Sequence, residues 1–104
     1  MKNFRDLIVW NKAHALTLEI YKVTDHFPRR EMFGVTSQLR RASSSIAANI
    51  AEACGRVAKG DFSRFLSNAM GSASEVEYFL VLCRDLKLLT PEVHQRCNHD
   101  IVEV

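Results

Sequence analysis

Apolar residues recur along the chain at the spacing of an α-helix. The clearest stripe advances in alternating steps of four and three residues through Val9, Ala13, Leu16, Ile20, Val23 and Phe27. Such steps place all the side chains on one face of a helix. The alternation of apolar and polar residues that is typical of strands is nearly absent. The pattern predicts an all-α chain with helices over residues 6–26, 34–53, 61–88 and 91–104.

Turn-forming and capping residues mark the ends of these predicted helices. Pro28 stops the first helix, and Gly55 is placed to end the second as a left-handed cap residue. Asp61 is a good N-cap for the third, and Thr90 followed by Pro91 predicts the start of the fourth. All connections are short, so neighbouring helices should be antiparallel. We therefore expect one domain, an antiparallel up-and-down four-helix bundle.

The third predicted helix contains a stretch that is apolar on every side. Six consecutive apolar residues run from Tyr78 to Cys83, and at 100° per residue they cover the whole circumference. A helix that is apolar all round is buried all round, whereas a bundle helix normally has one face in water. A second copy of the chain is the simplest cover for the outer face. The sequence thus predicts a homo-oligomer, with a candidate interface at Tyr78, Phe79, Val81 and Leu82.

Small residues are predicted to meet where the second and third helices cross. With the turn centred near residue 57, Ala42 should face Ser72, and Ser45 should face Ala69. The same register brings Glu75 close to Arg40 and Arg41. A salt bridge from Glu75 to one of these two arginines is therefore expected in the interior of the bundle.

Charge is unevenly distributed along the chain although the net charge is only +2. Residues 29–64 hold half of the basic groups, and nearly all of these are arginines. The acidic groups there are Glu31, Glu52 and Asp61, against Arg29, Arg30, Arg40, Arg41, Arg56, Lys59 and Arg64. Arginine pairs with phosphate oxygens in bidentate fashion, so Arg40, Arg41, Arg56, Lys59 and Arg64 are candidate nucleic-acid-binding residues. Some of these arginines could instead pair with carboxylates of the bundle, and the sequence leaves both interpretations open.

Motifs for catalysis and metal binding are absent from the sequence. It has no Gly-x-Ser-x-Gly, no phosphate-binding glycine loop and no His-Glu-x-x-His. His94, Cys97 and His99 lack zinc spacing, and no Glu-x-x-His pair could hold two irons. We expect no catalytic residue, no metal and no cofactor.

The cysteine count and the hydropathy suggest a cellular location. The chain has 3 cysteines, an odd number, and no secretory signal, which favours reduced thiols and a cytoplasmic protein. No apolar run approaches the roughly 20 residues that a membrane-spanning helix requires.

Several short motifs resemble one family of helical proteins. These are Phe4-x-x-Leu7-x-Val9-Trp10, the segment from Tyr21 through Phe27-Pro28 to Phe33-Gly34, Gln38-Leu39-Arg40-Arg41-Ala42, Ser45-Ile46-x-x-Asn49-Ile50-Ala51-Glu52, Gly55-Arg56, and Ala69-x-Gly71-Ser72-x-x-Glu75-x-Glu77. Together they resemble the 23S rRNA intervening-sequence proteins over residues 4–89. Two departures are Ala53, where the family usually has Gly, and Ala47, where Pro is frequent. The fourth helix also looks short.

The resemblance implies an up-and-down bundle that assembles as a ring, most often a pentamer. A related branch, the accessory variability protein of diversity-generating retroelements, is a basic ring that binds nucleic acid and reverse transcriptase. No catalytic residue comes with the family. Two functions follow as hypotheses: an RNA- or DNA-binding accessory protein, or an oligomeric scaffold that binds another protein without nucleic acid.

Overall fold

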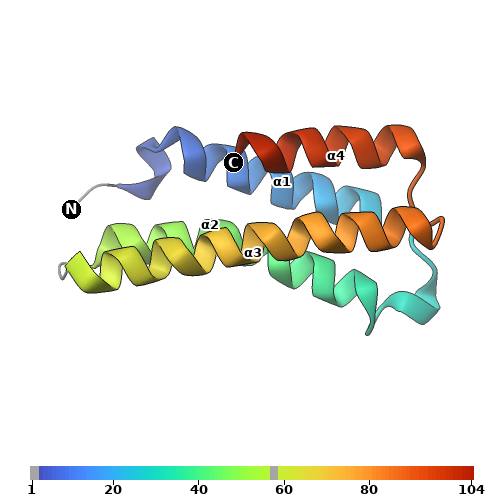
Figure 1. The fold of residues 1–104 in the computed structure, drawn as a ribbon, viewed down its shortest axis with the longest axis horizontal. Coiled ribbons are helices and arrows are strands. Elements are labelled where there is room, and N and C mark those ends of the chain that lie inside the picture. The colour runs from blue at the N-terminus through green and yellow to red at the C-terminus, as the bar shows by residue number, and fades with distance from the viewer. Residues whose placement is uncertain (1–2, 57–58) are drawn as a thin grey trace.

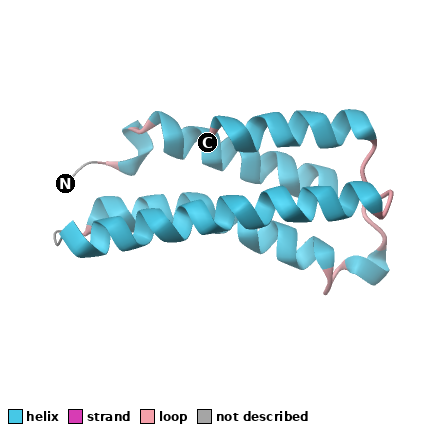
Figure 2. Cartoon of the chain, viewed as in Figure 1, coloured by secondary structure: helices cyan, strands magenta, loops and turns pink. Residues whose placement is uncertain are grey.

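The computed structural model describes residues 3–56 and 59–104 of the chain. Four α-helices make up most of it, with a short 3₁₀ helix before α1 and another before α2 (Figure 1). The elements are η1 (Phe4–Asp6), α1 (Ile8–Thr24), η2 (Arg29–Glu31), α2 (Val35–Gly55), α3 (Lys59–Asp85) and α4 (Pro91–Glu103). Every regular element in the described part is a helix, as Figure 2 shows. The expectation of an all-α chain is confirmed.

The four helices pack in a closed circuit. Each helix contacts the next one along the chain, and α4 closes back against α1. The contact between α2 and α3 is the most extensive, and these two helices form one side of the elongated molecule, which measures 43 × 23 × 18 Å (Figure 1). None of the described helices is long and apolar enough to cross a lipid bilayer.

The core is built from the apolar stripes that the sequence predicts. Fully buried side chains come from all four helices: Ala13, Leu16 and Ile20 from α1, Leu39, Ala42 and Ile46 from α2, Val76, Leu80 and Cys83 from α3, and Cys97 from α4. Val9, at the start of the first stripe, is different. It is 38% exposed and borders a groove that is described below.

Two predicted helix ends are wrong and one is confirmed. Thr90 is the N-cap of α4, and its hydroxyl accepts a hydrogen bond of 3.2 Å from the backbone N–H of Val93. Asp61 does not cap α3, because the helix begins at Lys59 and places Asp61 inside the first turn, where its charge still favours the helix dipole. Gly55 is the last residue of α2, and no glycine of the described residues has a positive φ.

The left-handed cap residue is instead Lys87, after α3. Its φ is 63°, and it is the non-glycine residue with a positive φ in the described chain. The N–H of Lys87 donates to the carbonyl of Arg84, and the N–H of Leu88 donates to the carbonyl of Cys83, both at 2.9 Å. These two bonds form a Schellman motif, in which glycine is the usual residue at the left-handed position.

The seam between α2 and α3 contains small and polar residues, as expected, with a slightly different register. Ser45 and Ser72 share a hydrogen bond of 2.9 Å between their hydroxyls, so Ser45 faces Ser72 and not Ala69, less than one helical turn away. Ser43 is fully buried, and its carbonyl accepts a bond of 3.0 Å from the hydroxyl of Thr17 on α1. Hydroxyls of this size let the helix backbones approach closely while every one of them finds a partner.

An ion pair joins α2 to α3 at the edge of this seam. The Arg41 guanidinium lies 2.9 Å from a carboxylate oxygen of Glu75. The side chains are 54% and 45% exposed, so the pair lies at the surface and not in the interior, where the sequence placed it. The reason is that the seam itself is filled by small residues, and longer side chains at its margins extend toward water.

We expect Lys87→Gly to raise the free energy of unfolding by about 0.5–1 kcal/mol, because glycine adopts a positive φ without the steric cost that lysine pays. Urea unfolding followed by circular dichroism measures the change. Lys87→Ala is the matched control, since alanine retains the strain and should give no such gain. A clear loss of stability in Lys87→Gly would contradict this account.

Replacing Glu75 should have a small effect. Glu75→Gln is expected to lower the free energy of unfolding by less than about 1 kcal/mol, because both partners of this ion pair are in contact with water. A double-mutant cycle with Arg41→Gln isolates the pairwise coupling, which should also be below about 1 kcal/mol. A coupling of roughly twice that size would indicate that the pair behaves as a buried one.

Candidate nucleic-acid interface

Arg40 extends from α2 toward α1. Its Nε donates a hydrogen bond of 2.7 Å to the hydroxyl of Thr24, and a terminal nitrogen lies 3.1 Å from the carboxylate of Asp25. The guanidinium also lies over the Tyr21 ring, 4.7 Å from its centroid. With 27% of its side chain exposed, Arg40 is held between two helices. It does not meet Glu75, the alternative partner that the sequence allowed.

Adjacent positions on α2 therefore send their arginines to different neighbours. Arg40 contacts the end of α1, whereas Arg41 contacts α3 through Glu75. Arg56 follows Arg41 at a distance of about 22 Å along the helix direction, at 1.5 Å per residue. The basic residues do not form one continuous stripe.

Arg56 and Arg64 do come together, at the end of the molecule where α2 stops and α3 starts. Both guanidinium groups lie over the ring of Phe65, at 5.0 Å and 4.9 Å from its centroid. Arg56 leaves α2 as its C-cap residue, and Arg64 and Phe65 belong to the second turn of α3. We call these three residues the Phe65 cluster. The side chain of Lys59, the remaining member of the predicted set, lies outside the described residues.

Each arginine of the Phe65 cluster also has a carboxylate partner. Arg56 lies 3.0 Å from Glu52, four residues earlier on α2, and Arg64 lies 3.5 Å from Asp61. All four side chains in these pairs are between 44% and 62% exposed. The arginines are therefore paired and still exposed, so both interpretations that the sequence left open stay predictions.

The predicted oligomer interface is only partly exposed in a single copy. Tyr78 is 59% exposed, whereas Phe79 and Leu82 pack against the core and Val81 is half-buried. Neighbouring helices of the same chain thus cover much of the apolar stretch Tyr78–Cys83 on α3. This stretch alone does not require a second copy, because α2 packs against one side of α3 and α4 packs against another.

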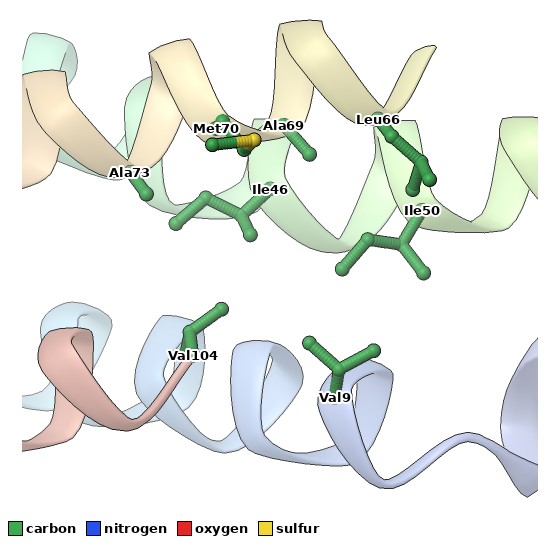
Figure 3. A pocket seen from close by; sticks show the side chains of 8 residues that line it. All are labelled: Val9, Ile46, Ile50, Leu66, Ala69, Met70, Ala73 and Val104. Atoms are coloured by element: carbon green, nitrogen blue, oxygen red, sulfur yellow. The ribbon is translucent and has the colours of Figure 1, made fainter. Parts of the chain in front are cut away.

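A larger apolar surface lies elsewhere, in a groove that the sequence did not predict. Figure 3 shows side chains from α1, α2 and α3 facing one another beside the C-terminal Val104. The groove has a volume of about 260 Å³ and is lined by Val9, Ile46, Ile50, Leu66, Ala69, Met70, Ala73 and Val104. A second cavity of about 450 Å³ shares Val9, Ile50 and Leu66 with it and continues toward Cys54 and Phe62.

The groove has a simple origin in helix length. α3 has 27 residues and α4 has 13, so the first half of α3 has no α4 beside it. Met70 is 73% exposed there, and Ile8 at the start of α1 is 74% exposed. The shortness of the fourth helix was the signal in the sequence that could have revealed this surface.

Two of the cysteines, Cys83 and Cys97, are buried thiols with raised pKa values. Burial raises the pKa of Cys83 to about 12, with a smaller contribution from the nearby charge of Glu31. Burial also raises the pKa of Cys97 to about 11. Both thiols therefore stay protonated at neutral pH. Among the described residues, no three His, Cys, Asp or Glu side chains are grouped so that they could hold a metal ion.

Comparison with known proteins places the chain in a family. The family model described as 23S rRNA-intervening sequence protein matches residues 5–104. A solved structure from Bacteroides thetaiotaomicron VPI-5482, a protein with unknown function from the S23 ribosomal protein family, is 30% identical with a TM-score of 0.82. The similarity covers 92% of this chain and 90% of that one, and no curated protein matches. The chain belongs to the 23S rRNA-intervening sequence protein family.

Proposed function

We propose that this chain is a non-enzymatic accessory protein that binds RNA or DNA as a homo-oligomer of antiparallel four-helix bundles. The Phe65 cluster carries the proposal, because it concentrates two arginines on one aromatic ring at one end of the molecule. The family resemblance suggests a ring, most often of five copies, as the form of the oligomer. No cofactor is part of the proposal.

The Phe65 cluster suits a phosphate backbone for geometric reasons. A guanidinium that lies flat on an aromatic ring keeps its N–H edge directed outward, where it can donate to two phosphate oxygens. Aromatic rings beside arginines are also typical of surfaces that bind single strands without sequence preference. Phe65 itself is half-buried, so the ring supports the arginines more than it offers a free stacking face.

The carboxylates of Glu52 and Asp61 compete with phosphate but do not prevent binding. Exposed ion pairs contribute only about 0–1 kcal/mol each, so a phosphate can replace a carboxylate at small cost. In a symmetric oligomer the Phe65 cluster is repeated in every copy. Repetition raises the total affinity, because a nucleic acid bound at one cluster reaches the next at high effective concentration.

A second candidate function is an oligomeric scaffold that binds another protein and no nucleic acid. The observation that favours it is the pairing of Arg40, Arg41, Arg56 and Arg64 with carboxylates, which leaves little uncompensated positive charge at these positions. On this view the arginines hold the helices together. The two functions differ in whether RNA binds at low salt.

We expect the protein to bind a single-stranded RNA 20-mer in 25 mM salt, with an affinity that falls steeply as salt is added, because each phosphate contact releases counterions. Fluorescence anisotropy of a labelled RNA measures both quantities. The double variant Arg56→Ala, Arg64→Ala should weaken binding about tenfold or more and reduce the salt slope by roughly 1 to 2.

Arg84→Ala is the matched control for this experiment. Arg84 is also exposed and ion-paired, with Asp85 at 3.1 Å, but it lies at the far end of α3. Its replacement should leave RNA binding nearly unchanged. Absence of binding at 25 mM salt would refute the nucleic-acid role and support the scaffold. Equal losses from Arg84→Ala and the double variant would refute the Phe65 cluster as the place where RNA binds.

Self-association is tested separately from RNA binding. Sedimentation velocity at micromolar concentration should show a species several times heavier than the 11.8 kDa chain. The exposed apolar side chains Tyr78 and Met70 are the proposed contacts with the second copy, so Tyr78→Glu or Met70→Glu should shift the protein toward monomer while its helical circular dichroism persists. Leu18→Glu is the control, because Leu18 is 59% exposed, the same fraction as Tyr78, but lies on α1. Wild-type protein that sediments as a monomer would contradict the proposal.

A further inference from the structure

A cavity lined by both polar and apolar side chains lies between the end of α1 and the beginning of α2. Its volume is about 400 Å³, and two arginines, Arg29 and Arg40, are among the residues that line it. Thr24 and Thr36 contribute hydroxyl groups, and Asp25 contributes a carboxylate. The Phe65 cluster is near the opposite end of α2, so this cavity is separate from the proposed RNA contact.

Thr36 is the unusual member of the wall. It is 5% exposed, and its Oγ1 has no hydrogen-bond partner among the described residues. A buried hydroxyl without a partner costs free energy, typically about 1–3 kcal/mol. Thr24, on the same wall, differs in that its hydroxyl accepts a bond from Arg40 and donates to the carbonyl of Ile20 at 2.7 Å. Thr36 therefore holds a hydrogen-bonding capacity that the fold does not use.

The backbone beside Thr36 has the same property. α2 begins at Val35 after Gly34, without a side-chain cap and without an acidic residue in its first turn. No acceptor is assigned within the described chain to the N–H groups of Val35, Thr36 and Ser37. Free N–H groups at the start of a long helix, together with the positive end of its dipole, favour an anion.

The two arginines supply the positive charge that complements these donors. Arg40 is fixed in place by Thr24 and by the Tyr21 ring, which reduces the entropy that it loses on binding a ligand. Arg29, in η2, is exposed and therefore free to turn toward the cavity. The carboxylate of Asp25 currently pairs with Arg40, but its side chain is 76% exposed and can swing into water when another anion arrives.

We propose that this cavity binds a phosphate monoester group. The phosphate oxygens accept hydrogen bonds from the Thr36 hydroxyl and the first N–H groups of α2, and Arg29 and Arg40 neutralise its charge. Inorganic phosphate, a free nucleotide and the 5′-phosphate of a nucleic acid all present this chemistry. The inference does not rest on the Phe65 cluster or on the oligomer.

Inorganic phosphate in a low-salt buffer is the first probe, with binding measured by isothermal titration and by the amide chemical shifts of Thr36 and Ser37. We expect saturable binding that moves these amide signals. Arg29→Gln should weaken binding about tenfold, as expected for the loss of a charge-assisted hydrogen bond. Arg30→Gln is the matched control, since Arg30 is the adjacent exposed arginine of η2 but does not line the cavity. Equal losses from the two variants would overturn the site.

Thr36→Val gives a second, sharper test, because valine has nearly the shape of threonine without the hydroxyl. The ligand-free variant should melt a few degrees higher, since an unpaired buried hydroxyl is removed. Phosphate affinity should nevertheless fall severalfold. If the hydroxyl had no role in binding, Thr36→Val would melt at a higher temperature with unchanged phosphate affinity, and that result would overturn the proposal. Absence of phosphate binding by the wild type would overturn it as well.

Two further binding measurements identify the molecule that carries the phosphate. RNA 20-mers with a 5′-phosphate and with a 5′-hydroxyl are compared in the Arg56→Ala, Arg64→Ala background, alongside a nucleoside 5′-monophosphate. Preference for the phosphorylated RNA assigns the cavity to a strand end, whereas binding of only the mononucleotide or inorganic phosphate assigns it to a free ligand. Because the cavity is separate from the Phe65 cluster, phosphate binding should survive in this background, and its loss there would overturn the site.

Discussion

The close packing of α2 against α3 is the constraint on which the other features depend. At the seam the hydroxyl of Ser72 donates to that of Ser45, which lets the two backbones lie close together. On the α1 side of α2, the hydroxyl of Thr17 donates to the backbone carbonyl of Ser43. A larger residue at Ser45 or Ser72 would separate the helices. That separation would break the Arg41–Glu75 pair at the margin and move Arg56 away from the ring of Phe65, which belongs to the other helix. Packing at the seam therefore determines where the charges lie.

Those charges are balanced locally. Each arginine at positions 40, 41, 56 and 64 has a carboxylate within 3.5 Å. The pairs of Arg40 and Arg41 join α2 to a neighbouring element, whereas those of Arg56 and Arg64 are local, four and three residues apart in sequence. A surface of this kind binds phosphate by exchange of one anion for another, so its free energy is small per site and sensitive to salt. Affinity sufficient for a biological role then has to come from repetition of the site. This requirement links nucleic-acid binding to self-association more closely than the net charge of +2 suggests.

Periodicity, local cap chemistry and the pairing of Glu75 with Arg41 could be predicted from the sequence, whereas the partner of Arg40 could not. The stripe from Ala13 to Ile20 and the Thr90 cap were predictable because each depends on residues close in sequence. The helix ends at Gly55 and Asp61 were mispredicted, since packing between α2 and α3 lengthens both helices, so that Gly55 is the last residue of α2 and Asp61 lies inside the first turn of α3. Asp25 as the partner of Arg40 depends on the angle at which α1 meets α2, because Asp25 lies at the end of α1 whereas Glu75 lies on α3, where Arg41 pairs with it. The sequence specifies the set of charges but not that angle.

The difference in length between α3 and α4 gives the molecule two unlike ends. Where α4 is present, the core is closed and the side chains of Leu80, Cys83 and Cys97 are excluded from water. Where it is absent, Met70, which lines the groove in Figure 3, is 73% exposed to water. Covering such surface would gain roughly 25 cal/mol for each Å² of apolar surface removed. The Phe65 cluster lies at this open end, because Phe62 and Leu66 of the same turns line the groove and its neighbouring cavity. A second copy that buried this end would therefore change the surroundings of Arg56 and Arg64 directly. Under the proposed function, assembly would then alter phosphate binding at the Phe65 cluster.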